Sequence, residues 1–173
     1  MINATLIDHM GTDLSVVNAA RVSFNKTSNW ELTDWRDSED YARKEVLSEA
    51  DTKLINYLAK HKHTSPFGHC FASFHIKAPV FVARQLVKHK FLRWNEISRR
   101  YVDDEPEFYQ PDEWRGRSED KKQGSDGVVD VGKIGDISLA SKTLYNSLLD
   151  RGVAPEQARM VLPQSTMTEW YWS

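Results

Sequence analysis

Apolar and polar positions in the first forty residues predict one short strand, one helix and a loop. The strand covers Thr5 to Asp8 and ends before Gly11. Asp13 can cap a helix that continues through Arg21, because a side-chain oxygen at this position accepts from the free backbone N–H groups of the first turn. The stretch from Lys26 to Arg36 is polar and aromatic without a clear period, and we predict a loop there.

The middle of the chain combines helical spacing with strict alternation. A second helix is expected from about Ser48 to His61, with an inner face of Leu54, Ile55, Tyr57 and Leu58. Alternation from Cys70 to Lys77 predicts a strand. Pro79 suits the first position of the next helix, because an N–H there would have no intrahelical partner. That helix is expected to run from Val80 to Lys90 on a stripe of Val80, Ala83 and Val87.

The remaining pattern predicts a strand, an insertion and three helices. The strand covers about Asn95 to Val102, and the stretch from Trp114 to Gly135, rich in charge and glycine, predicts a mobile surface insertion or lid. A long helix is expected from a cap at Asp136 to a stop at Gly152. Short helices then follow from Pro155 to Arg159 and from Pro163 through Tyr171.

These elements predict a single domain over residues 1–173, of the α/β class and α+β type, with an antiparallel sheet flanked by helices. The strands are joined by helices and turns without a repeated βαβ unit. A length of 173 residues, with 40% hydrophobic and 28% charged residues, excludes a disordered chain. We find no internal repeat.

Composition also limits location and partners. No apolar run is long enough to span a bilayer, and no basic leader precedes an apolar stretch at the start, so we expect neither membrane insertion nor secretion. The single cysteine, Cys70, excludes an internal disulfide framework and fits a reducing compartment. A formal net charge of -2 makes bulk attraction to nucleic acid weak, so an anion site must be local.

Two rows of polar side chains mark the segment that carries chemistry. On the predicted helix, Lys88 lies four residues after Arg84, and His89 lies four residues after Gln85, so each pair shares a face. On the predicted strand, one side carries Glu96, Ser98 and Arg100. A ligand with a phosphate, a sugar and a planar base would satisfy these groups. A solvated basic face, with Glu96 in surface ion pairs, is the alternative and stays open.

The string from Lys88 to Tyr101, KHKFLRWNEISRRY, resembles the signature of the flavin-dependent thymidylate synthases, the ThyX family. That signature has Arg-His-Arg, seven residues, then Ser, usually around N-E-x-S-x-R-Y. Further ordered similarities are AARVSF at 19–24, HTSPFGH at 63–69, APVFVARQ at 78–85 and ARMVLP at 158–163. Lys88 and Lys90 replace the two signature arginines, which keeps the charge but loses the bidentate fork.

The resemblance implies a ThyX-like fold and assigns ligand roles. Contacts to dUMP are implied for Gln85, Lys88, Glu96, Ile97, Ser98, Arg99, Arg100 and Arg159, with Arg100 and Arg159 on the phosphate. Contacts to FAD are implied for His63, Ser65, Lys88, His89, Lys90 and Glu96. It also implies NADPH and methylenetetrahydrofolate as co-substrates, a homotetramer, and a cytoplasmic location, in the host cytoplasm if the source is viral.

The resemblance further implies a C-terminal block with an arginine that polarises the uracil ring. We expect that block beyond residue 173 and assign no catalytic residue within the chain. A nucleophilic Ser98 lacks an Asp-His pair at motif spacing, and Cys70 is interpreted as a structural cysteine. The histidines 61, 63, 69 and 75 lack a compact ligand pattern, so we expect no metal site.

Alternatives remain within and outside this family. A relative directed at dCMP, or one that forms a hydroxymethyl product, shares the same residues. A single-strand nucleic-acid-binding module would use the cations and aromatics of Lys88 to Trp94, although the overall acidity opposes it. A flavin-free structural or assembly protein is the third class.

Overall fold

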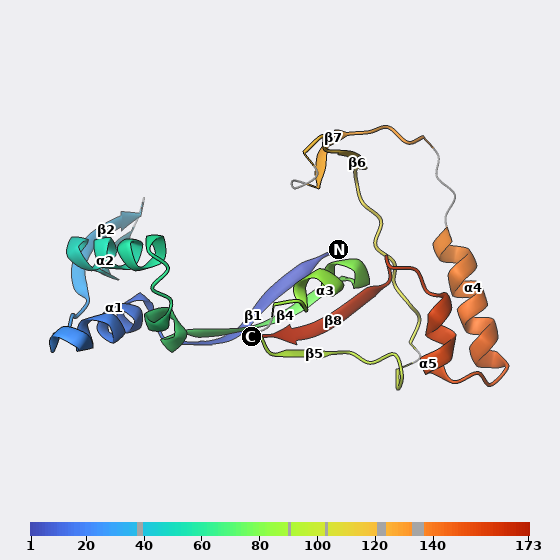
Figure 1. The fold of residues 1–173 in the computed structure, drawn as a ribbon, viewed down its shortest axis with the longest axis horizontal. Coiled ribbons are helices and arrows are strands. Elements are labelled where there is room, and N and C mark those ends of the chain that lie inside the picture. The colour runs from blue at the N-terminus through green and yellow to red at the C-terminus, as the bar shows by residue number, and fades with distance from the viewer. Residues whose placement is uncertain (38–39, 90, 103, 121–123, 133–136) are drawn as a thin grey trace. The chain divides into compact units, whose positions relative to one another are not determined.

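The computed structural model describes residues 1–37, 40–89, 91–102, 104–120, 124–132 and 137–173 (Figure 1). The chain divides into two compact units. One unit contains residues 1–5 and 75–172, and the other contains residues 6–74 with Ser173. The prediction of one domain over the whole length stays a prediction. No helix among the described residues is both long and apolar enough to cross a membrane.

The unit of residues 6–74 contains two helices in contact, α1 (Asp13–Arg21) and α2 (Glu49–Lys60). Short 3-10 turns, η1 (Val22–Phe24) and η2 (Ser65–His69), follow them. Val16, Val17 and Leu58 are buried on the helix faces. The helix predicted over 48–61 is confirmed, with Ser48 as its N-cap and His61 as its C-cap. Tyr57, predicted on the inner face, is 53% exposed.

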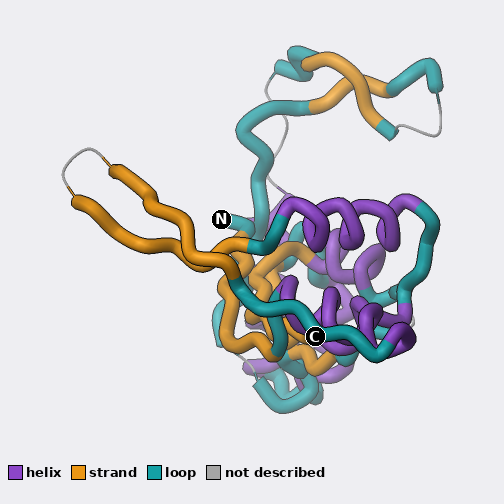
Figure 2. The backbone as a smooth tube through the Cα atoms, turned by 90° about the vertical axis from the view of Figure 1, so that its left-hand side faces the viewer, coloured by secondary structure: helices purple, strands orange, loops and turns teal. Residues whose placement is uncertain are grey.

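Two other predictions for this unit need correction. Thr12 rather than Asp13 is the N-cap of α1, and its N–H donates to Ser15 Oγ at 3.0 Å. The predicted loop over 26–36 contains most of strand β2 (Glu31–Asp37), which pairs with β3 (Asp40–Val46) in the antiparallel hairpin of Figure 2. The described side chains at 31–34 and 43–45 are exposed. Because this hairpin buries neither face there, its sequence lacks the alternation of apolar and polar residues by which a strand is predicted.

A four-stranded sheet has the order β1-β4-β8-β5, from β1 (Asn3–Met10), β4 (Phe71–Pro79), β8 (Met167–Trp172) and β5 (Trp94–Glu96). Strands β1 and β4 contribute residues to both units. The strands predicted over 5–8 and 70–77 are therefore confirmed, each with shifted ends. The α+β class is confirmed as well, since β2–β3, β5–β8 and β6–β7 all pair antiparallel.

The helix predicted after Pro163 is wrong, because residues 167–172 form strand β8. Thr166 N–H donates to Pro163 O at 3.0 Å, which makes a turn instead of a first helical turn. Beyond it, Thr168 and Trp170 are buried on one side, as β-branched and aromatic residues on a half-buried strand should be.

The helix and strand of the signature segment are both shorter than predicted. Helix α3 (Val80–Leu86) begins after Pro79, which is its N-cap, and it ends before Val87, which is 47% exposed. The strand ends at Glu96 because the chain turns at Ser98, whose carbonyl accepts from Tyr101 N–H at 3.1 Å. The alternation predicted over 95–102 therefore breaks, and Glu96, Ser98 and Arg100 do not share one side of a strand.

The remaining elements follow from residue 104 onward. The predicted insertion contains a hairpin of β6 (Arg115–Arg117) and β7 (Ser125–Val128). Helix α4 (Ile137–Asp150) ends as predicted at Gly152, which has φ +80° and whose N–H donates to Leu149 O at 2.8 Å. Its predicted cap, Asp136, lies outside the described residues. Helix α5 (Pro155–Ala158) and the turn η3 (Arg159–Val161) confirm the short helix after Pro155.

Helix α4 buries two serines and one tyrosine, while two of its aliphatic residues are exposed. Ser138, Ser141 and Tyr145 are buried, whereas Ile137 and Leu144 are 65% and 50% exposed. Helix α4 contacts both α5 and η3.

Candidate functional site

The unit of residues 1–5 and 75–172 carries a groove of about 590 Å³. That volume lies within the range of small-molecule sites. Its polar lining is Arg84, Glu96, Ser98, Arg99, Glu156, Arg159, Gln164, Thr166 and Thr168. Its apolar lining is Val80, Ala83, Val87, Trp94, Ile97, Met160, Leu162, Pro163 and Met167.

Backbone hydrogen bonds tie the walls of the groove together. Val80 N–H donates to Thr166 O at 2.9 Å and Phe81 N–H donates to Gln164 O at 3.1 Å, so the start of α3 is fixed to the segment before β8. Ile97 N–H donates to Glu169 O at 2.9 Å and extends the β5–β8 pairing by one residue. Three segments distant in sequence therefore surround one space.

Two side-chain donors hold the Glu96 carboxylate in the groove. Thr168 Oγ1 donates to its Oε1 at 2.7 Å, and Trp94 Nε1 donates to its Oε2 at 3.3 Å. Trp94 in turn stacks on Trp170, with ring centroids 4.5 Å apart. Within the described ranges, no cationic side chain forms an ion pair with Glu96. Its carboxylate is held by neutral donors only.

Arginines provide the positive charge of the groove. Arg99 Nη1 donates to Asp104 O at 2.8 Å, and Arg159 Nε donates to Glu156 O at 3.3 Å, so both guanidinium groups keep donors for a ligand. With Arg84 they outnumber the two glutamates of the lining. A phosphate is the group that such planar donors bind best.

The structure places the residues predicted to contact dUMP in two groups. Five line the groove: Glu96, Ile97, Ser98, Arg99 and Arg159. Gln85, Lys88 and Arg100 are not part of the lining. Lys88 Nζ donates to Gln85 Oε1 at 3.0 Å, and Arg100 Nε lies 3.3 Å from Glu156 Oε2. Since Glu156 lines the groove, Arg100 lies at its edge.

The residues predicted to contact FAD occur in both units. His63 and Ser65 belong to the unit of residues 6–74, where both are exposed and the His63 ring lies edge-on to Tyr57 at 6.1 Å. Lys88 and His89 follow α3 and are exposed. Lys90 lies outside the described residues. Ammonium, imidazole and hydroxyl donors of this kind fit the diphosphate and flat ring of a dinucleotide.

Several groove residues are absent from the sequence prediction. Thr168 and Trp94 hold Glu96, and Glu156 pairs with Arg100. The sequence pattern predicts Arg84 on the polar helix face and assigns it no ligand contact, whereas the structure includes it in the groove lining. The alternation of Thr166, Thr168 and Trp170 is a signal for a strand in place of a helix. That strand would have placed Thr168 next to the signature strand and so among the site residues.

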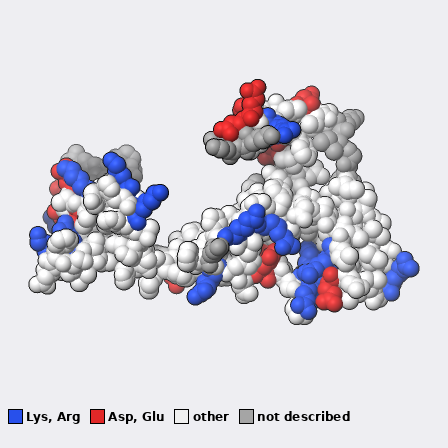
Figure 3. All heavy atoms as spheres, in the orientation of Figure 1, with Lys and Arg blue, Asp and Glu red and all other residues white. Residues whose placement is uncertain are grey.

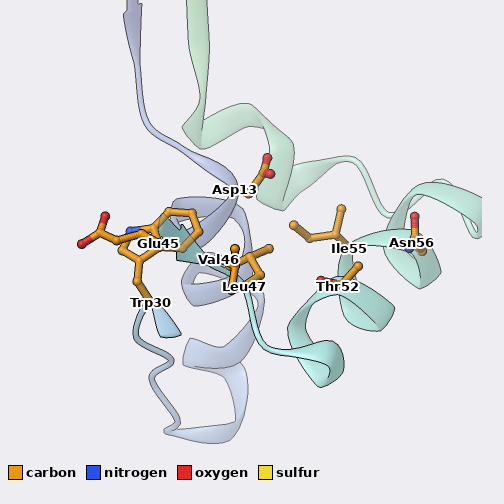
Figure 4. A pocket seen from close by; sticks show the side chains of 8 residues that line it. All are labelled: Asp13, Trp30, Glu45, Val46, Leu47, Thr52, Ile55 and Asn56. Carbon is orange, nitrogen blue, oxygen red and sulfur yellow. The ribbon is translucent and has the colours of Figure 1, made fainter. Parts of the chain in front are cut away.

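A second hollow, of about 480 Å³, lies in the unit of residues 6–74 (Figure 4). Trp30, Leu47 and Ile55 contribute apolar surface, and Asp13 and Glu45 contribute carboxylates. No Lys or Arg is among the described residues that line this hollow. The two carboxylates disfavour an anionic ligand in this hollow, whereas the three arginines of the groove favour one.

Other candidate chemistry finds less support. The described residues contain no group of three or more His, Cys, Asp and Glu side chains arranged to hold a metal ion. Cys70 is half-buried, and its Sγ lies 3.3 Å from Thr12 O. Cationic and acidic side chains are interspersed on the face shown in Figure 3, which differs from the continuous basic surface of nucleic-acid binders.

Comparisons with known proteins agree on one family. Residues 5–173 match the family model described as thymidylate synthase complementing protein. The chain is 39% identical over 171 residues to a flavin-dependent thymidylate synthase of Thermus thermophilus, which covers 96% of the chain and 57% of that protein. It is 42% identical over 175 residues to the enzyme of Kosmotoga olearia, with 97% and 69% covered. The chain thus spans a little over half of the first relative.

A solved structure shares the fold. The UMP/dUMP methylase PolB from Streptomyces cacaoi, bound with 5-Br dUMP, is 32% identical with a TM-score of 0.77. The match covers 99% of the chain and 72% of that protein. The structure of the same methylase with 5-Br UMP gives a TM-score of 0.73 at 30% identity.

Proposed function

Because the chain belongs to the family of thymidylate synthase complementing proteins, we propose that it is a flavin-dependent thymidylate synthase that converts dUMP to dTMP. The groove carries the proposal, since it combines three arginines with one ordered carboxylate that has no cationic partner among the described residues. A nucleoside monophosphate offers the matching groups, a dianionic phosphate and the hydrogen-bond donors of its sugar and base.

The groove suggests how dUMP lies. The phosphate meets Arg159 and Arg99, and Arg100 joins them by releasing Glu156 at the edge. Ser98 and the backbone near Ile97 then face the sugar and base, and Glu96 accepts from a nucleoside donor. Gln85 and Lys88 are exposed beside the groove and complete the proposed set of dUMP contacts. This arrangement separates the phosphate from Glu96, as charge repulsion requires.

The overall reaction replaces the hydrogen on uracil C5 by a methyl group. Methylenetetrahydrofolate supplies the carbon, NADPH supplies two electrons, and the C5 hydrogen leaves as a proton. FAD, when bound, carries those electrons as a hydride equivalent. Its proposed contacts are His63, Ser65, Lys88, His89, Lys90 and Glu96. The chain's own groups bind and orient the reactants.

We also propose a homotetramer in the cytoplasm. Large apolar side chains are exposed in the isolated chain, including Phe91 at 98% and Met160 at 79%. Exposed apolar surface of this kind is typical of association surfaces. Sedimentation of the purified protein checks the assembly, and a monomer at micromolar concentration would contradict it.

A dUMP-dependent tritium-release assay with NADPH and methylenetetrahydrofolate tests the function. We expect tritium to leave [5-³H]dUMP only when all three substrates and FAD are present. UMP serves as a competing substrate, because the PolB structures contain both a UMP and a dUMP analogue, and dCMP tests the alternative of a cytosine-directed relative. A colourless protein that releases no tritium, and whose binding to oligonucleotides weakens with salt, would instead support a nucleic-acid-binding module.

A further inference from the structure

Glu96 is held by two side chains to which no ligand role is assigned. Thr168 Oγ1 donates to Oε1 at 2.7 Å, and Trp94 Nε1 donates to Oε2 at 3.3 Å. Each carboxylate oxygen thus receives its own donor. Two donors on different oxygens fix the rotation of the carboxylate, which a single donor would leave free.

Both donors are themselves fixed. Thr168 is only 7% exposed, and its branched side chain has few rotamers on a strand. The Trp94 ring stacks on Trp170, which is 1% exposed. Glu96 faces Trp170 across the β5–β8 pair, so Thr168 lies two residues along the same strand, on the diagonal. The sheet itself therefore sets the position of the Glu96 side chain.

The Glu96 carboxylate keeps unused acceptor positions, and the residue lines the groove. A carboxylate has about four acceptor positions, and two are used by Thr168 and Trp94. Glu96, Thr168 and Trp94 all line the groove. A carboxylate repels phosphate and accepts only from donors, which a nucleoside has on its sugar hydroxyls and its base N–H. We propose that Thr168 and Trp94 are positioning residues that hold Glu96 in the orientation in which it accepts a hydrogen bond from the bound nucleoside.

This inference rests on the proposed function, and substitutions at Thr168 test it. Thr168→Val removes the hydroxyl at nearly constant shape, and Thr168→Ser keeps it. By calorimetry on the FAD-loaded protein, we expect Thr168→Val to weaken dUMP binding about tenfold, since hydrogen bonds to charged groups carry that order of energy. Thr168→Ser should stay within about twofold of the unchanged protein.

A double-mutant cycle separates positioning from general damage. If Thr168 acts through Glu96, Thr168→Val should change dUMP affinity by less than about twofold in a protein that already carries Glu96→Ala. A tenfold loss in that background as well would overturn the inference. So would a failure of Thr168→Ser to restore binding.

Trp94→Phe provides an independent test should Thr168→Val fail to fold. It keeps a ring to stack on Trp170 and removes only the N–H donor. We expect about threefold weaker binding, because the 3.3 Å contact is longer. Unchanged binding in both variants, with Glu96→Ala still weakened, would refute positioning while leaving the proposed function intact. Absence of dUMP binding by the unchanged protein would refute both.

Discussion

Two carboxylates in different units of the chain are both held by side-chain hydrogen bonds, but they differ in their capacity to bind a ligand. Asp51, in α2, is 2% exposed and receives Arg21 Nε at 2.8 Å, Ser48 Oγ at 2.8 Å and Ser28 Oγ at 3.0 Å. Glu96, in β5, is exposed to the groove and receives two neutral donors. Asp51 has an arginine beside it, and Glu96 has no cationic partner among the described residues.

The hydrogen-bonding and ionic partners of a carboxylate distinguish a structural acid from one that is available to a ligand. Arg21 neutralises Asp51 and donates to it from both Nε and Nη2, and the two serines donate as well, so the roughly four acceptor positions of the carboxylate are used. The Glu96 carboxylate is held by two donors but keeps unused hydrogen-bond acceptor positions. It lines a groove that also contains arginines. An ordered acid with remaining acceptor capacity is what a binding site requires. The contrast can be tested at each carboxylate in turn.

Asp51→Ala should have the largest effect, on stability. It leaves Arg21 without its partner, and breaking a buried pair costs about 3–5 kcal/mol. Because the Arg21 side chain is 24% exposed, we expect a loss near the lower limit, about 3 kcal/mol, in urea unfolding. Lys53→Ala is the control, since its exposed pair with Glu49 contributes only about 0.3 kcal/mol. Equal losses in the two variants would remove the distinction between the sites.

Glu96→Ala should have the next largest effect, on binding rather than on stability. We expect dUMP affinity to fall roughly thirtyfold, about 2 kcal/mol, because a hydrogen bond to a charged acceptor is lost. The free energy of unfolding should fall by only about 1 kcal/mol, the lower limit for a donor that loses its acceptor, because water in the groove can replace Glu96 as the partner of Thr168 Oγ1. Calorimetry with dUMP and urea unfolding of one preparation measure both. A large stability loss without a binding defect would make Glu96 a structural acid like Asp51.

Arg159→Ala should weaken dUMP binding about tenfold, the energy of one charge-assisted contact. Arg100→Ala should weaken it less, because Arg100 pairs with Glu156 at the edge of the groove and must leave that pair to reach the phosphate. Deoxyuridine, which lacks the phosphate, serves as the control ligand and should bind both variants and the unchanged protein alike. A greater loss for Arg100→Ala would place the phosphate at the edge instead.

The pH dependence of stability should report Asp51, with a smaller effect. Burial alone would raise the pKa of Asp51, but hydrogen bonds from Arg21, Ser48 and Ser28 outweigh it and hold the pKa below its ordinary value of 3.8. The stabilisation is therefore complete above the unfolded pKa and is lost as pH falls through the lower folded pKa. Unfolding free energies measured from pH 5 downward should decline less steeply in Asp51→Asn. Parallel curves would contradict this assignment.

Local signals sufficed for elements that end on their own residues. Ser48 caps α2, and its Oγ accepts from Asp51 N–H at 3.1 Å. Gly152 ends α4 with a left-handed φ that favours glycine. Such signals act within about one helical turn, so they can be recognised from neighbouring residues in the sequence. The family resemblance also implied a shared ligand role for Glu96, Ser98, Arg99 and Arg159, and all four line the groove.

Tertiary structure decided what depends on distant partners. Residues 167–172 have apolar positions that fit a helix, and they form β8 because β4 and β5 lie on either side of them. The sequence determined, by local caps, turns and motif residues, where helices end and which side chains carry charge. Only the folded chain decided that Thr168 meets Glu96 and that Lys88 does not line the groove. The reason is range: caps act over a few residues, whereas strand pairing joins segments about seventy residues apart, and no local pattern encodes that partner.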